Sequence, residues 1–465
     1  MYFTDVTFLV FFLPVCLTTC YLVPGRAKKP AIALFSLLLY GFMDPVYLPV
    51  LLNVAIFNFL FGFLICRFGR DRRLRRGLYL AALSVDGLVF FFFYLVTASY
   101  NRIQEAVNAS EQTRTLGVPI GLVFLLMSCV SYLVDVYQRK APFLRNFWDY
   151  LTYLFFFPKL FAGPVCEYHA FRRQLKAPDF SVCAAADGIE LFVFGFSKKM
   201  LLADNIGQLR LVVFAQNIDA MPLLTGWLGA FAVLFEIYFD ATGYIDMARG
   251  LGKLLGFSLP INYRAPFSAV SVSDFFRRYQ ITVVHWIKRY LCSLAPGREK
   301  RWKIFRIWIA SAAFALFVGG SKNAFFSAFY FFAILLLEEL FLKKALISWP
   351  NLFRTWLTAL LVMFGFLFYA LDSISDIFPY LLSMLGVGVR FADGNTLYLL
   401  SSYWAVILLC VLFGSGIVGR YWRKLRCRYA RVTSVVQPLL LLLLFGVSLA
   451  FSVSDSTSGF LCMHG

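Results

Sequence analysis

The sequence predicts an all-α, polytopic integral membrane protein, and three observations support this fold class. Of the 465 residues, 60% are hydrophobic and only 15% are charged, whereas soluble domains carry about 25% charged residues. Apolar runs approaching the roughly 20 residues that cross a bilayer recur from end to end. Basic residues gather between these runs rather than within them. We therefore expect a single membrane domain over residues 1–465.

Seven apolar runs are long enough to predict spans directly. These are residues 47–66, 78–97, 118–136, 221–239, 356–371, 397–412 and 432–453. Six further runs are shorter or interrupted, and we expect some of them to be re-entrant or interfacial. These are residues 7–23, 31–43, 147–165, 190–203, 304–319 and 324–340. The first of them lacks a basic leader and a small-residue cleavage site, so we expect a retained span rather than a signal peptide.

The formal net charge is +19, with basic clusters at residues 67–76, 298–303 and 420–431. Such clusters occur in nucleic-acid-binding proteins, but in a membrane protein they are typical of cytoplasmic loops. We therefore expect no nucleic-acid partner, membrane lipids with anionic headgroups beside these loops, and a cytoplasmic position for residues 67–76. Ten cysteines are scattered without a CxxC pair, which predicts neither a disulfide framework nor a metal site.

The region 147–340 differs from both ends of the chain because proline and glycine interrupt its apolar runs. Irregular backbone at membrane depth survives only where it lines a cavity or is buried in protein. One such segment contains Pro158, Lys159, Gly163 and Pro164. It is either part of a site or a simple helix break between two spans, and the sequence leaves both interpretations open.

Two carboxylates, Asp240 and Asp246, lie beside an apolar run, where charges are costly unless they are paired or face a cavity. Because they are six residues apart, they face different sides of a continuous helix, and Gly243 is expected to bend the chain between them. Pairing with Arg249 and Arg264 is one interpretation of the two carboxylates. The other is that they line a site.

Residues 273–290 combine aromatic and basic side chains on helical spacing, which predicts an amphipathic helix in the membrane interface. We expect Ser273 or Asp274 to cap its start. His285 lies in this segment. A lone histidine at an interface serves either as a hydrogen-bonded anchor or as a base, and the pattern favours the anchor.

Together, these segments resemble the membrane-bound O-acyltransferase superfamily, in the branch of the alginate O-acetyltransferase membrane subunit and the teichoic acid D-alanyltransferase. The resemblance rests on the order of motifs along nearly the whole chain, at residues 11–14, 131–137, 157–164, 198–205, 238–248 and 274–290. It implies a ring of tilted and re-entrant helices around a central funnel, where a cytoplasmic acyl donor meets an extracytoplasmic acceptor. It also implies a histidine acting as a general base.

The chain departs from this family pattern at the histidine positions, which the resemblance places on Val318, Gln280 and Phe331. Valine and phenylalanine cannot exchange a proton. His285 is a weak replacement, because on a regular helix it would point about 140° away from Gln280. The resemblance assigns the funnel and substrate-binding residues to Pro158, Lys159, Gly163, Pro164, Asp240, Tyr244, Asp246, Asp274, Arg277, Arg278, Gln280, Gly319 and Asn323.

The resemblance implies two functions that differ in chemistry. One is O-acylation, expected to be O-acetylation, of a cell-envelope or exported polysaccharide through a degenerate or reorganised site. Its donor would be an acyl-CoA or acyl-carrier thioester, with no bound cofactor. The other is an inactive scaffold or acyl conduit for an extracytoplasmic, esterase-like (SGNH-type) acyltransferase. A secondary transporter would show inverted repeats, and none is visible. The expected location is a bacterial-type cytoplasmic membrane.

Overall fold

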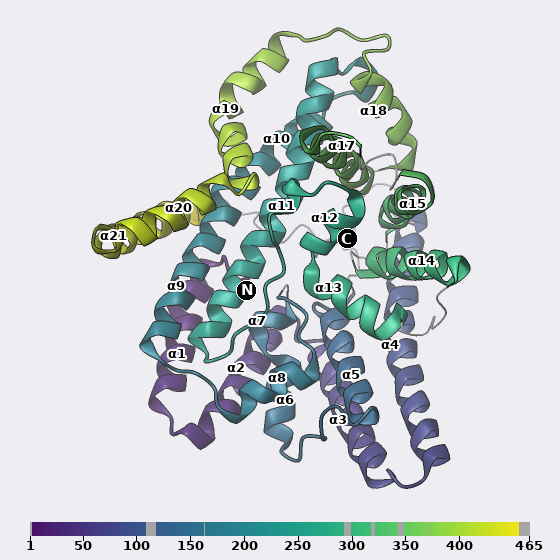
Figure 1. The fold of residues 1–465 in the computed structure, drawn as a ribbon, viewed down its shortest axis with the longest axis vertical. Coiled ribbons are helices and arrows are strands. Elements are labelled where there is room, and N and C mark those ends of the chain that lie inside the picture. The colour runs from purple at the N-terminus through teal and green to yellow at the C-terminus, as the bar shows by residue number, and fades with distance from the viewer. Residues whose placement is uncertain are drawn as a thin grey trace. The chain divides into compact units, whose positions relative to one another are not determined.

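The structure is a computed structural model that describes residues 2–107, 118–161, 163–292, 299–317, 321–342, 348–371 and 373–454. Across these ranges every regular element is a helix (Figure 1), which confirms the all-α class. Seven helices are long and apolar enough to cross a membrane, so the chain is a multi-pass membrane protein. They are α3 (Leu48–Arg67), α4 (Arg72–Val107), α11 (Leu223–Leu254), α15 (Lys322–Leu337) continued by η7 (Glu338–Leu342), α17 (Asn351–Ala370), α19 (Gly394–Gly414) and α21 (Ala430–Ser454).

Six of the seven long expected spans correspond to these helices. The exception is the run 118–136, where α5 (Leu122–Tyr137) has only 16 residues. The helix begins after Gly121, because this residue has a left-handed φ of 74° that is not helical. Conversely, the expected short run 324–340 lies within a helix of spanning length. The length of an apolar run therefore predicted the membrane helices well. The errors arose where the helix in the structure is shorter or longer than the apolar run.

By internal packing the chain divides into two compact units. Unit 1 comprises Met1–Phe192 with Met247–Pro260, and unit 2 comprises Val193–Asp246 with Ile261–Gly465. The helices α9 (Val182–Ser197) and α11 both pass through a unit boundary. The single domain and the central funnel stay predictions.

Unit 1 contains the N-terminal helices. Its further elements are η1 (Phe8–Phe12), α1 (Leu13–Leu22), α2 (Gly25–Met43), α6 (Phe147–Phe155), α7 (Phe157–Leu160) and α8 (Tyr168–Lys176). Helices α3, α4 and α5 pack against one another. A buried hydrogen bond of 2.8 Å from Asn58 Nδ2 to Asp86 Oδ1 joins α3 to α4. Such a bond between two spans holds polar groups away from lipid.

Unit 2 contains the remaining helices, built around an aromatic core. Its further elements are η2 (Lys198–Ala203), α10 (Asp204–Phe214), η3 (Ile218–Ala220), η4 (Pro266–Ser268), α12 (Val272–Arg278), α13 (Ile281–Trp286), η5 (Ile287–Leu291), α14 (Lys300–Phe317), η8 (Ile374–Asp376), α18 (Ile377–Met384) and α20 (Ile417–Arg428). The core includes Phe275, Tyr279, Phe331 and Phe366, which meet in tilted, stacked and edge-on ring contacts.

Gly243 does not bend the chain, contrary to expectation. It lies inside the continuous helix α11. A Cβ at this position would approach the carbonyl oxygen of Gly195 to 2.8 Å. The glycine is therefore needed for close packing of α11 against α9, and small residues commonly serve this purpose between membrane helices.

The expected amphipathic helix over residues 273–290 is divided into α12, α13 and η5. Gln280 separates the first two with a left-handed φ of 54°, a conformation that costs energy for a residue other than glycine. The cap is Ser271 rather than Ser273 or Asp274, since the Ser271 side chain accepts a 3.1 Å hydrogen bond from the Asp274 backbone N–H. The helical angle between Gln280 and His285 therefore does not apply.

A candidate donor site: the cationic cavity of unit 2

Unit 2 holds a cavity of about 680 Å³, formed by α12, α13, η5, α14, α15 and η7. This volume falls within the range of small-molecule sites, roughly 300–1,000 Å³. The helix α14 lines it with one continuous face, because its contributing residues recur every three or four positions: Lys303, Arg306, Ile307, Ala310, Ser311 and Phe314. We call this space the cationic cavity.

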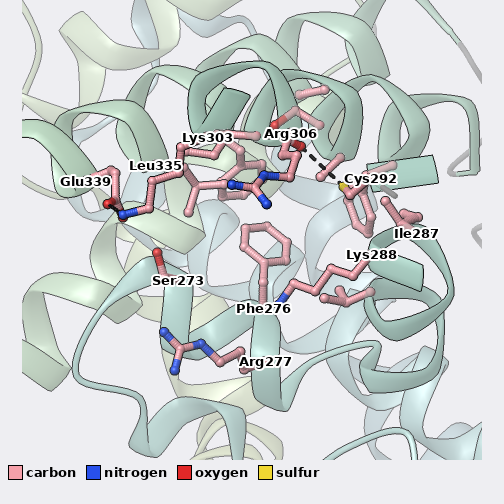
Figure 2. A pocket seen from close by; sticks show the side chains of 17 residues that line it. Ser273, Phe276, Arg277, Ile287, Lys288, Cys292, Lys303, Arg306, Leu335 and Glu339 are labelled. Carbon is pink, nitrogen blue, oxygen red and sulfur yellow. Dashed lines mark hydrogen bonds and ion pairs between the residues drawn. The ribbon is translucent and has the colours of Figure 1, made fainter. Parts of the chain in front are cut away.

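Cations outnumber carboxylates in the cavity lining. The cations are Arg277, Lys288, Lys303 and Arg306, and the single carboxylate is that of Glu339. Lys303 Nζ forms an ion pair with Glu339 Oε1 across the cavity (Figure 2). Figure 2 also shows the side chains of Arg306 and Lys288 directed toward the space around Phe276. Three positive charges are thus in excess, which favours a ligand with an anionic group.

Two of these cations lie close enough to influence each other. Desolvation is the larger effect and the neighbouring Arg277 guanidinium the smaller one, and together they lower the pKa of Lys288. Lys288 therefore gives up its proton at a lower pH than an ordinary lysine does. A lysine of this kind binds an anion while charged and accepts a proton when neutral.

The cavity lining also contains aromatic side chains. Phe276 meets the edge of Phe331 at a centroid distance of 5.0 Å and that of Phe314 at 5.6 Å. Aliphatic side chains of Val284, Ile287, Ile307 and Leu335 line it as well. A space lined by both cations and hydrocarbon suits a ligand that combines phosphate with an acyl chain.

Three residues singled out from the sequence line the cavity, Ser273, Arg277 and Phe331. Asp274 and Arg278 do not. They form a 3.0 Å ion pair with each other on α12. Gln280 is also absent from the lining, because its Oε1 accepts a 2.7 Å hydrogen bond from Asn262 Nδ2 in a buried loop contact.

The other candidate residues from this part of the sequence that the structure describes are not in the lining of the cationic cavity. His285 is exposed and does not line the cavity. Asn323, in the first turn of α15, donates a hydrogen bond to the Leu371 carbonyl. Val318 and Gly319 lie outside the described residues, between α14 and α15 in sequence.

The two carboxylates Asp240 and Asp246 are paired with lysines, and their pairing with Arg249 and Arg264 stays a prediction. Lys199 Nζ lies 2.9 Å from Asp240 and 2.6 Å from Asp204, and Lys198 Nζ lies 2.5 Å from Asp246. A neighbouring pair joins Arg210 to Glu236 at 2.5 Å. We call these seven residues the paired cluster. None of them lines the cationic cavity.

Tyr244 lies one helical turn beyond Asp240 on α11 and is buried in the same unit. Like the paired cluster, it stands apart from the lining of the cationic cavity.

The proline-rich segment predicted as a site lies in unit 1. Phe156 breaks the helix between α6 and α7. Lys159 is 2% exposed; its Nζ donates to Ser128 Oγ at 3.0 Å and lies 3.8 Å from the Tyr153 ring centre. Gly163 leaves no room for a side chain beside the Pro158 carbonyl. Pro158, Lys159, Gly163 and Pro164 therefore pack tightly, and their role in a site stays a prediction.

Sequence reasoning missed the three remaining cations of the cavity. Lys303 was interpreted as part of a basic loop, and Lys288 and Arg306 were not singled out. The signal that would have identified Lys303 and Arg306 is their spacing on α14, which places them on one face together with apolar residues.

Comparison with known proteins gives the family context of this region. Residues 121–307 match the model of the membrane-bound O-acyltransferase family. This segment belongs to the membrane-bound O-acyltransferase family. All four cations of the cavity fall within the matched segment. The family assignment therefore covers the residues that carry the site's charge.

Three curated relatives of this O-acyltransferase segment illustrate the range of similar proteins. The chain is 32% identical over 314 residues to the "Probable alginate O-acetylase" of Pseudomonas aeruginosa, covering 66% of this chain and 59% of that protein. It is 28% identical over 339 residues to the peptidoglycan O-acetyltransferase of Helicobacter pylori, covering 65% and 64%. It is 24% identical over 217 residues to the teichoic acid D-alanyltransferase of Lacticaseibacillus rhamnosus, covering 43% and 50%. The chain thus spans less than two thirds of the length of these relatives.

Proposed function

We propose that this chain is a membrane O-acyltransferase that transfers an acyl group, most simply acetyl, to a polysaccharide of the cell envelope. The observation that carries the proposal is the cationic cavity, which lies largely in the segment that belongs to the O-acyltransferase family. The names of relatives that act on alginate and peptidoglycan support a polysaccharide acceptor. A bacterial cytoplasmic membrane is the location in keeping with these relatives and with the spanning helices.

The cavity is the proposed site for the acyl donor. Acyl-CoA and acyl-carrier thioesters share a phosphopantetheine arm, which combines phosphate with a thioester-linked acyl group. Arg277 and Arg306 would bind the phosphate through charge-assisted hydrogen bonds. The wall formed by Phe276, Phe314 and Phe331 would contact the arm and the acyl group. Donor binding would then need no cofactor other than the donor itself.

Acyl transfer also requires a group that accepts the proton of the acceptor hydroxyl. The described lining of the cavity contains neither histidine nor aspartate. Lys288 is the proposed base, because its lowered pKa leaves more of the amine neutral. The hydroxyl oxygen would form the ester as the thioester C–S bond breaks. The proton passes to the Lys288 amine and then to the departing thiolate, so the lysine ends neutral and the thiol is released.

A second candidate function is an acyl conduit without chemistry of its own. It is favoured by the absence of histidine at Val318, Gln280 and Phe331, the positions to which the resemblance assigns the family's histidines. In this case the chain would bind the donor and pass the acyl group to an extracytoplasmic, esterase-like partner. Both functions use the cationic cavity, and they differ only in where the ester bond forms.

Reconstituted proteoliposomes distinguish the two functions. The purified chain would receive acetyl-labelled acetyl-CoA or acetyl-carrier on one side and an acceptor oligosaccharide on the other. We expect label in the oligosaccharide without any added protein and a loss of transfer in Lys288→Arg. Transfer that occurs only with an added esterase-like protein would support the conduit. No transfer under either condition, from either donor, would contradict the proposed function.

Val318→Ala provides a second comparison in the same assay. A conduit should tolerate this change because valine carries no chemistry. A catalytic site reorganised around residue 318 should lose transfer. The variant must first show an unchanged melting temperature, so that loss of activity is not loss of fold.

A further inference from the structure

The helix α20 (Ile417–Arg428) has a composition unlike any other described helix of unit 2. It connects the spanning helices α19 and α21 (Figure 1). Residues 414–454 contain no aspartate or glutamate, whereas six cations lie within and just after α20: Arg420, Arg423, Lys424, Arg426, Arg428 and Arg431. No acidic side chain within this stretch of sequence neutralises them.

Most of the apolar and basic residues of α20 occupy different faces. At about 100° per residue, Ile417, Val418, Tyr421, Trp422 and Leu425 fall within a sector of about 140°. Arg420 and Arg426 lie outside this sector, Lys424 lies beside its edge at Ile417, and Arg428, the last residue of the helix, falls within it. A strong apolar face opposite a basic face is the pattern of a helix that lies in a membrane surface.

The described residues of the protein cover the apolar face of α20 only in part, since Val418 and Trp422 are half-buried. No residue of α20 whose exposure is described is buried, and Tyr421 is 71% and Leu425 46% exposed. An apolar face of this size in water would be unfavourable. It therefore requires a covering of lipid or of another protein.

The connections of α20 hold it at the ends of two spans. Only Ser415 and Gly416 separate it from α19, and only Tyr429 separates it from α21. Gly416 has a left-handed φ of 68°, which turns the chain sharply after the span. Since α19 and α21 are membrane-spanning in length and composition, α20 cannot move far from the level at which they leave the hydrocarbon.

We infer that α20 lies in the membrane surface and binds anionic phospholipids, with its apolar face among the acyl chains and its cations on the headgroup phosphates. This site goes beyond the proposed acyl transfer and does not depend on it. Each lysine or arginine near an anionic surface increases binding about fivefold at moderate ionic strength, so several together should enrich anionic lipid around α20.

Cys427 provides a reporter on the basic side of α20, where it is exposed. The full chain would carry Cys66→Ser, Cys183→Ser and Cys462→Ser, and a fluorophore would be attached at Cys427. It would be reconstituted in phosphatidylcholine vesicles containing the same small fraction of either nitroxide-labelled phosphatidylglycerol or nitroxide-labelled phosphatidylcholine. We expect severalfold stronger quenching by phosphatidylglycerol, and we expect high salt to remove the difference.

Matched variants of α20 distinguish the effect of losing positive charge from the effect of disturbing the fold. Arg420→Gln, Lys424→Gln, Arg426→Gln and Arg428→Gln combined should equalise quenching by the two lipids. The charge-retaining set Arg420→Lys, Lys424→Arg, Arg426→Lys and Arg428→Lys should keep the difference. Glutamine at Arg67, Arg70, Arg72 and Arg73 should also leave it unchanged, because these residues lie in another loop.

Two results with the fluorophore-labelled chain before any charge is removed would overturn the inference. Equal quenching by the two lipids would show that α20 lacks preference for anionic headgroups. Quenching by neither would show that another protein surface covers the helix. Acyl transfer is measured separately, so failure of this inference leaves the proposed function standing, and the reverse also holds.

Discussion

The paired cluster and the cationic cavity are built from the same kinds of side chain, yet they differ in charge balance and access. In the paired cluster, three cations face four carboxylates, and Lys199 and Asp240 are 3% and 1% exposed. In the cavity, four cations face one carboxylate around a space of about 680 Å³. Charges paired at short distance join α11 to η2 and α10, whereas the excess cations around the cavity are available to an anionic ligand. Substitutions should therefore affect stability in the first region and binding in the second.

The largest effect is expected at the centre of the paired cluster. Lys199→Met removes this cation from the buried carboxylate of Asp240 and the half-buried carboxylate of Asp204, which should cost about 3–5 kcal/mol of unfolding free energy. Thermal unfolding of the purified chain measures this as a large drop in melting temperature. Adding Asp204→Asn and Asp240→Asn to Lys199→Met should restore much of the loss. An unchanged melting temperature for Lys199→Met would show that these ion pairs do not hold the helices together.

The next effect is expected in the cavity, on binding rather than on stability. Arg306→Gln and Arg277→Gln each remove a charged donor, worth about 1.5–3 kcal/mol when it meets an anion, so donor affinity should fall roughly tenfold or more. Equilibrium binding of labelled acetyl-CoA or acetyl-carrier measures this loss. Arg278→Gln is the matched control, because Arg278 lies on α12 but pairs with Asp274 outside the cavity. A large drop in melting temperature for Arg306→Gln would contradict the distinction between the two regions.

Lys288 should separate binding from chemistry. Lys288→Arg keeps the positive charge, so donor affinity should change little while acyl transfer is lost. Lys288→Met should also lose transfer. Since the pKa of Lys288 is lowered, the amine loses its proton below the ordinary value of about 10.5. Acyl transfer should therefore rise as the pH approaches this lowered pKa, because only the neutral amine accepts the hydroxyl proton. A transfer rate that does not change with pH in the unsubstituted chain would exclude Lys288 as the base.

The smallest effect is expected at Glu339. Glu339→Gln removes the only carboxylate of the cavity lining and leaves Lys303 without this ion-pair partner. Because Lys303 is half exposed, the pair contributes at most about 1 kcal/mol to stability. Anion affinity should rise about twofold, as measured by the same binding assay. A fall in affinity would mean that Glu339 contacts the ligand directly or orients Lys303 for it.

The spanning helices were largely predictable because a bilayer requires long apolar runs. The runs that became α3, α4, α17 and α19 are uninterrupted, and their helices match the expectation closely. Local breaks were harder to predict. Gly243 looked like a bend but serves close packing in α11, and Gln280 looked helical but adopts a left-handed φ. In both cases the backbone conformation depends on residues that pack nearby in the fold, and the sequence alone does not identify these residues.

The candidate site was predictable only in part for the same reason. Polar residues of the central region identified Arg277, yet Asp246 and Lys198 are 48 positions apart, and nothing local indicates that they pair. The cations of α14 were hidden by their resemblance to an ordinary basic loop. Their helical spacing was visible in the sequence, but its meaning depends on α12 and α15 facing the same space.

Equilibrium binding of acetyl-CoA and of an acetyl-carrier protein to the purified full chain tests the central claim most directly. We predict saturable binding of at least one of these donors. Arg306→Gln should weaken this binding roughly tenfold or more, and Arg278→Gln should leave it unchanged. The unsubstituted chain and both variants should have equal melting temperatures. Binding of neither donor, or equal weakening by the two arginine variants, would contradict the assignment of the cationic cavity as the donor site.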